Sequence, residues 1–165
     1  SKIEGFAFLP ITSFMMALTT FVSQNRGAKE YERARKGARF GLVCSVSLAE
    51  TIGLLIALFV TPLMRLFVDD LQVIQYGVER AHYATILFFM LSYSHGVSAV
   101  LRGVGKSVVP MVVMLVCWCL VRVTLLTMLN MLFHNILFVY LIYPFTWSLS
   151  SIVFFLYYRK INWQE

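Results

Sequence analysis

The chain has 165 residues, of which 59% are hydrophobic and 13% are charged, and its mean hydropathy is +0.77. A soluble domain is about 45–50% apolar and about 25% charged, so this chain in water would expose apolar patches too large for a soluble monomer. The formal net charge of +6 fits loops that lie against anionic phospholipid, and the high apolar content argues against nucleic acid as a partner.

Five apolar segments reach the roughly 20 residues that a helix needs to cross the hydrocarbon layer. Their runs are continuous rather than alternating, which favours helices over a transmembrane β-barrel. Short loops between them favour antiparallel neighbours. The sequence therefore predicts an all-α fold, a polytopic membrane helix bundle. The predicted helices cover residues 5–23, 40–64, 78–101, 108–131 and 136–158.

The breaks between these segments have local causes. The first predicted helix ends before a Gln–Asn–Arg–Gly stretch in which Asn25 or Gly27 can adopt the left-handed cap conformation. The charged stretch 29–36 that follows is predicted to be a surface helix on anionic lipid. Pro10 and Pro144 fall inside predicted spans, where proline usually kinks a helix.

Lysine and arginine gather in alternate loops, which orients the chain. The positive-inside rule predicts that loops 24–39 and 102–107 and the C-terminus are cytoplasmic. We expect a multi-pass protein of the plasma (inner) membrane. The N-terminus is then outside without a signal peptide, which predicts an odd number of helices upstream. We therefore expect a fragment of a longer protein; the alternative is a five-helix protein with an exported start.

Two charges lie deep in the predicted spans. Glu50 is about 15 Å and Arg122 about 21 Å along their helices from the cytoplasmic side. An intramembrane charge costs at least about 2.5–3.5 kcal/mol, so such residues face protein or a water-filled cavity. One hypothesis is that Glu50 binds a coupling proton or sodium ion. The other is that Glu50 and Arg122 form a structural ion pair.

Other polar residues give weaker signals. His95 in the third predicted helix could relay protons near neutral pH or simply bond a neighbouring helix. Gly105, Lys106 and Ser107 look like the end of a phosphate-binding loop, but Val100 stands where that loop needs glycine. No catalytic constellation, metal-ligand spacing or cofactor motif is recognised, so the sequence does not predict an enzyme.

Three stretches together carry a resemblance to a known family, the multidrug and toxic-compound extrusion (MATE) transporters. Each stretch is weak alone, but their order and spacing are specific, and the resemblance spans essentially the whole chain. The stretches are Ser23–Ala28 followed by Glu32–Ala34, Leu66–Phe67 with Asp69–Asp70, and Leu101–Ser107 with Pro110. Tyr143–Pro144 with Trp147 also looks like a bacterial branch of the family.

The resemblance implies that residues 1–165 are part of the C-terminal lobe of a twelve-helix transporter, its eighth to twelfth helices. Such proteins are secondary active antiporters that export cationic or amphipathic drug-like molecules in exchange for Na⁺ or H⁺, with no other cofactor. The expected partners are membrane lipid, the small-molecule substrate and the missing N-terminal part, without which the fragment is expected to be inactive. The alternatives are a flippase for lipid-linked precursors and a non-transporting scaffold subunit.

The resemblance also implies that the first and third predicted helices face a central cavity. Aromatic and methionine side chains suit varied amphipathic cations. Many bacterial members carry a coupling carboxylate in the helix that corresponds to 78–101. This chain has no buried acid there, since Glu79 is at the outer end. The coupling site then lies in the missing lobe, involves Glu50, or is not of that type. The candidate cavity residues are Phe14, Met15, Thr19, Ser92, Tyr93 and His95.

Overall fold

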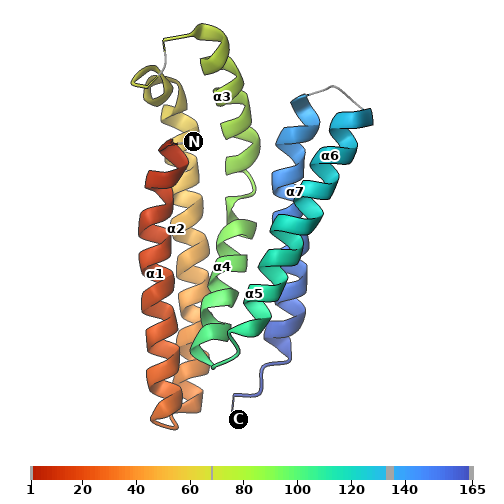
Figure 1. The fold of residues 1–165 in the computed structure, drawn as a ribbon. Helices are drawn as coiled ribbons and strands as arrows, with labels where there is room; N and C mark the ends of the chain where they lie inside the picture. The colour runs from red at the N-terminus through yellow and green to blue at the C-terminus, as the bar shows by residue number, and fades with distance from the viewer. Residues whose placement is uncertain (1, 68, 133–135, 164–165) are drawn as a thin grey trace.

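The computed structural model describes residues 2–67, 69–132 and 136–163, and all regular structure in these ranges is helical, which confirms the all-α class (Figure 1). The elements are α1 (Lys2–Gly27), α2 (Tyr31–Arg65), α3 (Leu71–Thr85), α4 (Phe88–Gly103), α5 (Val108–Met114), the π-helix η1 (Leu115–Val121), α6 (Arg122–Leu132) and α7 (Ile136–Arg159).

Within the described residues, three helices are long and apolar enough to cross a membrane: Tyr31–Arg65, Val108–Leu129 and Tyr140–Arg159. The pair Leu71–Tyr83 and Phe88–Gly103 makes a fourth if it is one bent span. α1 has 26 residues, about 39 Å of helix, and lies beside α2 (Figure 1). These apolar helices make the chain a multi-pass membrane protein.

The segment after α1 differs from the prediction. Residues 31–36 are not a separate surface helix but the first turns of α2. Ala34 and Ala38 are fully buried, and their small side chains allow one face of this part of α2 to pack on the bundle, while Glu32 and Lys36 stay exposed. The left-handed residue of the turn is Lys29, with φ of 61°, rather than Asn25 or Gly27.

A stripe of small residues allows α4 to pack closely on both α1 and α2. The stripe recurs at helical spacing and consists of Ser92, Gly96, Ala99 and Gly103, all buried. A Cβ atom added at Gly103 would lie 2.8 Å from Val22 Cβ and 2.9 Å from the Thr19 carbonyl oxygen. Small residues of this kind let membrane helices approach closely, and α4 becomes the central helix, in contact with α1, α2, α5 and α7.

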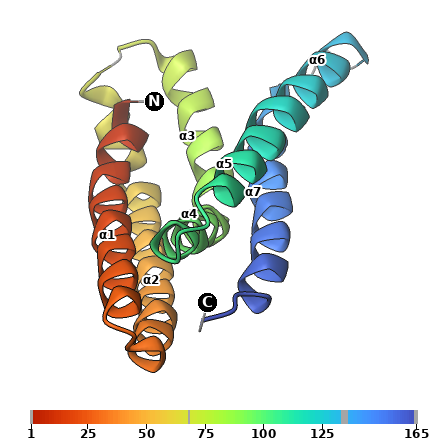
Figure 2. The same ribbon diagram turned by 60° about the horizontal axis from the view of Figure 1, so that its bottom comes forward.

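The predicted helix over residues 78–101 is instead two helices. α3 begins earlier, at Leu71, and ends at Thr85, and α4 begins at Phe88 at an angle of 61° to α3. The predicted helix over 108–131 is made by α5, η1 and α6 in succession. Figures 1 and 2 show α6 and α7 side by side, leaning away from α1 and α2.

Candidate functional site at the break between α3 and α4

Glu50 caps the start of α4 from a neighbouring helix. It is half-buried near the middle of α2, and its Oε1 accepts a hydrogen bond from the Phe89 backbone N–H at 2.8 Å. The first N–H groups of a helix have no partner within it, and the positive helix end favours a carboxylate. Because the side chain at the N-cap position, Leu87, makes no capping bond, the carboxylate of Glu50 takes this role.

Gly53, almost one turn further along α2, allows the break to approach that helix. A Cβ atom at this position would lie 3.1 Å from the Phe88 ring and 3.4 Å from the Thr85 carbonyl oxygen. The last residue of α3 and the first of α4 therefore both pack on α2. A helix kinks where a side chain takes the place of a backbone carbonyl in its hydrogen bonds. Here the Glu50 carboxylate, instead of a carbonyl of the same helix, accepts the Phe89 N–H.

Arg122 is held by α7 and by aromatic rings. Its Nη2 and Nε donate to Thr146 Oγ1 at 2.7 and 3.2 Å. The guanidinium carbon lies 4.6 Å from the centre of the Tyr143 ring and 5.5 Å from that of Trp118. Arg80 of α3 lies 5.1 Å from the same Tyr143 ring. A charge in an apolar segment is thus stabilised by a hydroxyl and by ring faces.

Trp147 joins this aromatic cluster to the break. Its ring centre lies 6.4 Å from that of Tyr143 and 6.1 Å from that of Phe88, the first residue of α4. A continuous set of contacts therefore runs from α2 through the start of α4 to α7 and η1. We call this set the break site; it consists of Glu50, Phe88, Trp118, Arg122, Tyr143 and Trp147.

Below the break site, hydroxyl groups join α4 to α7. Ser94 Oγ lies 3.0 Å from Ser150 Oγ and 2.9 Å from Ser151 Oγ, and Trp118 Nε1 donates to Ser150 at 3.2 Å. The His95 ring meets the Trp118 ring edge-on, with centres 5.1 Å apart. The side of α4 that faces α7 is therefore polar, whereas the side that faces α1 carries the small-residue stripe.

The hypothesis of a Glu50–Arg122 ion pair is wrong. Both residues are described by the structure, and no ion pair joins them: Glu50 bonds Phe89, and Arg122 bonds Thr146. The reason is packing. Helix α4 supplies the partner of Glu50, and α7 supplies the partner of Arg122. Depth along the membrane, from which the pair was inferred, does not say which helices are neighbours.

The predicted cavity residues fall into two groups. Met15 and Ser92 are buried in the packed core, and Ser92 Oγ donates to the Ser45 carbonyl oxygen at 2.9 Å. Thr19 Oγ1 lies 3.1 Å from the Ala99 carbonyl oxygen and so joins α1 to α4. Phe14 and Tyr93 are only partly buried. Met15, Ser92 and Thr19 therefore contribute to helix packing.

The sequence did not predict that Trp118, Tyr143, Trp147 or Arg80 belongs to a site. Part of the signal was present, because Trp118 precedes Arg122 by four residues and Tyr143 precedes Trp147 by four, so each pair shares a helix face. Arg80 could not have been found in this way, because only the fold brings α3 onto α7.

The family model for MatE matches residues 1–128 of the chain. The chain belongs to the MatE family. The match confirms the resemblance drawn from the loop motifs. It includes Glu50, the break, Trp118 and Arg122, while Tyr143 and Trp147 lie beyond it.

This MatE chain is also similar to a curated protein named "Probable multidrug resistance protein NorM" from Thermotoga maritima. The two are 29% identical over 112 residues, which are 68% of this chain and 24% of that relative. The chain thus spans less than two thirds of the relative's length. No solved structure matches the chain.

Proposed function

We propose that this MatE chain is part of a secondary active antiporter that exports cationic or amphipathic small molecules, driven by a sodium or proton gradient. The observation that carries the proposal is the family match over residues 1–128. The name of the T. maritima relative, a multidrug resistance protein, supports it. Carriers of this kind alternate between inward- and outward-open states by rocking one lobe against the other.

We further propose Glu50 as a coupling group. Its carboxylate lies in the middle of an apolar helix and accepts a backbone N–H at a helix break. Transporter helices are often discontinuous where they bind coupling ions. A proton or sodium ion on the Glu50 carboxylate reduces the negative charge that attracts the Phe89 N–H, so ion binding weakens the cap of α4 and loosens the angle between α3 and α4.

For the substrate, we propose contacts on the exposed parts of α1 and α4. Phe14 and Tyr93 keep part of their rings accessible and can offer ring faces to a cation. His95 lies on the α7 side of α4, beside Trp118. The Tyr143 ring is already occupied by two guanidinium groups, so it serves the fold rather than a substrate cation.

The proposal also includes the setting of the chain. We place it in the plasma membrane, with loops 24–39 and 102–107 and the C-terminus in the cytoplasm, because these segments carry most of the basic residues. Its partners are the remaining part of the transporter and the surrounding lipid. The chain by itself does not transport, because one lobe cannot enclose a cavity that two lobes share.

The test uses the full-length protein in proteoliposomes, with an imposed sodium or proton gradient and ethidium as the fluorescent cation. The variant is Glu50→Gln, whose amide oxygen can still accept the Phe89 N–H but carries no charge for an ion. The matched control is Asp70→Asn, because Asp70 Oδ1 accepts the Gln72 N–H at 2.8 Å and so caps α3 in the same manner from an exposed position.

The proposal expects gradient-driven efflux in wild type and in Asp70→Asn. Glu50→Gln should lose at least roughly a hundredfold, because it removes the ion's own ligand and even an outer-sphere partner costs about 10–100-fold. Full efflux in Glu50→Gln would remove Glu50 from coupling and leave the antiporter intact. Absence of efflux in wild type under either gradient would contradict the antiporter.

The flippase alternative needs a basic cavity that can hold a pyrophosphate group. Arg80 and Arg122 come together at Tyr143, but the Arg122 guanidinium already donates twice to Thr146. This engagement favours the antiporter. A scaffold role would be favoured only if neither cations nor lipid-linked precursors moved in the same vesicles.

A further inference from the structure

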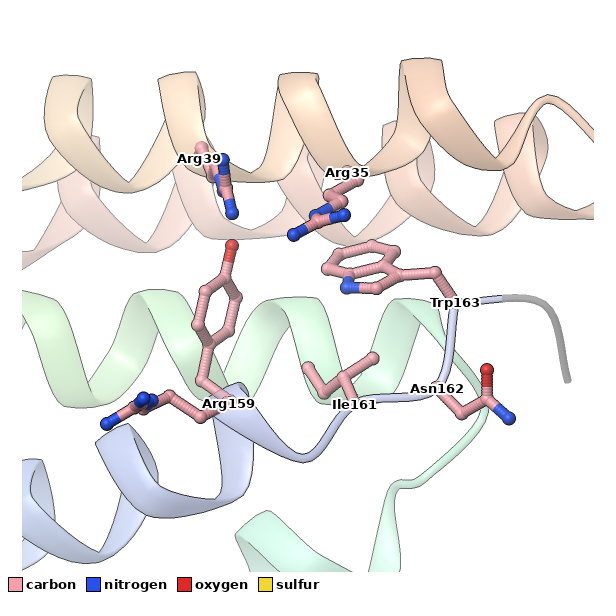
Figure 3. Close-up of a pocket in the computed structure, with 7 residues that line it drawn as sticks. Arg35, Arg39, Arg159, Ile161, Asn162 and Trp163 are labelled. Atoms are coloured by element: carbon pink, nitrogen blue, oxygen red, sulfur yellow. The ribbon is translucent and has the colours of Figure 1, made fainter.

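A basic pocket of about 420 Å³ lies between the first turns of α2 and the C-terminal segment of the chain. Arg35 and Arg39 are four residues apart and share one face of α2. Figure 3 shows both side chains pointing from α2 toward the segment that carries Trp163. The lining also includes Tyr158, Arg159, Ile161 and Asn162.

Among the residues that the structure describes, no carboxylate neutralises the positive charge of the pocket. In the described ranges, neither Arg35 nor Arg39 forms an ion pair, and the nearby carboxylate of Glu32 is 3.5 Å from Lys36 instead. Arg159 lies over the Phe155 ring at 5.8 Å and is directed away from the other two arginines (Figure 3). The two guanidinium groups of α2 therefore remain available for an anion.

A second basic hollow at the same end shows the contrast. It is lined by residues of the α1–α2 and α4–α5 turns, among them Arg26 and Arg102. Arg26 donates to the Val104 carbonyl oxygen, and Arg102 donates to Ser98 Oγ at 2.9 Å. These arginines are used in joining turns and helices, whereas Arg35 and Arg39 line the pocket, with Arg39 beside the Tyr158 hydroxyl of the pocket wall.

The C-terminal segment closes the pocket with aromatic and apolar contacts. Ile161 is 9% exposed and belongs to the main core. The Trp163 ring meets the Tyr158 ring edge-on, with centres 6.3 Å apart. Tryptophan and tyrosine rings are typical of the membrane–water interface, so the pocket has the composition of the headgroup layer.

Both α2 and α7 expose apolar side chains within about one turn of the residues that line the pocket. Directly after Arg39, α2 exposes Phe40 by 71% and Val43 by 65%, and α7 exposes Phe155 and Leu156. A phosphate group alone would fill the basic pocket but leave this surface uncovered. A molecule with a phosphate head and acyl chains matches both features, because guanidinium groups bind phosphate oxygens and acyl chains cover apolar side chains.

We propose that this pocket binds the phosphate headgroup of an anionic phospholipid, whose acyl chains lie along the exposed apolar surface that begins at Phe40. Basic pockets between membrane helices are known to hold lipid headgroups. The chemistry shared with free phosphate compounds is the phosphate itself; the lipid is assigned because of the adjoining apolar surface. The proposal is independent of the transport cycle and of its coupling ion.

The test is native mass spectrometry of the full-length protein in neutral detergent, with phosphatidylglycerol as the probe and phosphatidylcholine as the uncharged comparison. Glycerol 1-phosphate, added as a competitor, separates a lipid site from a site for free phosphate. The pocket variant is Arg35→Gln with Arg39→Gln. The control variant is Arg33→Gln with Lys36→Gln, which removes the same charge from the same helix outside the pocket lining.

We expect the pocket variant to lose at least about tenfold in phosphatidylglycerol affinity, since each basic residue contributes about a fivefold factor, and the control variant to lose less than about threefold. Arg35→Lys with Arg39→Lys changes the same two positions but keeps the charge, and it is expected to retain most of the binding, which separates loss of charge from disturbance of the fold at these positions. Equal losses in both glutamine variants, no preference over phosphatidylcholine, or full displacement by glycerol 1-phosphate would each overturn the proposal.

Discussion

Arg122 shows at the scale of one residue how an apolar helix carries a charge. The guanidinium carbon lies over the Tyr143 and Trp118 rings, and the guanidinium nitrogens donate to one hydroxyl, that of Thr146. Thr146 is itself fully buried and donates to the Tyr143 carbonyl oxygen at 2.9 Å. The charge is thus balanced by ring electrons and a polarised hydroxyl, and the arginine joins η1 and α6 to α7.

This geometry requires the planar guanidinium. Arg122→Lys keeps the charge but loses one of the two donor contacts and the stacking on Tyr143. We expect the free energy of unfolding of this variant to be lower than that of wild type by about 1–2 kcal/mol. Thermal unfolding in detergent, followed by tryptophan fluorescence, measures this, with Arg65→Lys at an exposed helix end as the control. Equal unfolding temperatures for the two variants would contradict the role of the rings.

Lys29 gives a second residue-scale prediction. Its φ of 61° lies in the left-handed region, which costs a residue with a side chain about 1 kcal/mol. Lys29→Gly removes this cost, so we expect it to raise the free energy of unfolding by about 0.5–1 kcal/mol. The comparison is Lys36→Gly inside α2, which is expected to lower it by about 1 kcal/mol. The prediction fails if both glycines lower stability.

At the scale of elements, the structure depends on how closely α4 packs on α1. The Thr19 hydroxyl donates to the Ala99 carbonyl oxygen at 3.1 Å, which is possible only because Ala99 and Gly103 have small side chains or none. The opposite side of α4 bonds α7 through Ser94. One short helix therefore holds both halves of the bundle together.

Gly103→Ala tests this packing. The added Cβ would meet Val22 and the Thr19 carbonyl oxygen at less than 3 Å, and the backbone atom cannot turn aside as a side chain can. We expect a loss of about 1–3 kcal/mol in unfolding free energy. Gly27→Ala, where no atom lies within 4 Å of the new Cβ, is expected to cost nothing. A harmless Gly103→Ala would show that α1 and α4 leave room for the added methyl group.

At the scale of the whole molecule, the basic segments gather at one end. The turn after α1, the turn after α4 and the C-terminal segment all lie at the bottom of Figure 1. The two basic hollows join these segments in pairs, since one contains residues of both turns and the other residues of α2 and the C-terminal segment. Antiparallel packing thus brings together charges that are far apart in the sequence.

This arrangement predicts one-sided labelling. In a background with Cys44, Cys117 and Cys119 replaced by serine, single cysteines at Lys106 and Lys160 should react with a membrane-impermeant maleimide only from the cytoplasmic face. A cysteine at Asp69 should react only from the opposite face, because α2 separates it from the α1–α2 turn. Labelling of all three from one face would contradict the proposed orientation.

Much of the fold follows from the sequence because membrane helices are set by local properties. A helix of about twenty apolar residues is long enough to span the hydrocarbon layer, whatever it packs against. The loop motifs of a family can be recognised in the sequence without knowledge of the helix packing. The all-α class, the family and the apolar helices could therefore be predicted. The alternation of basic loops was equally readable, since it is a property of the chain alone.

The tertiary structure decided the rest, because it depends on which helices meet. The break at residues 86–87 contains neither proline nor glycine; it is fixed by Glu50 and Gly53 of another helix. The partner of Arg122 is Thr146 rather than Glu50 because α7, not α2, packs beside it. Membrane depth can be read from one chain, but the contacts of a buried charge are set by the neighbouring helices.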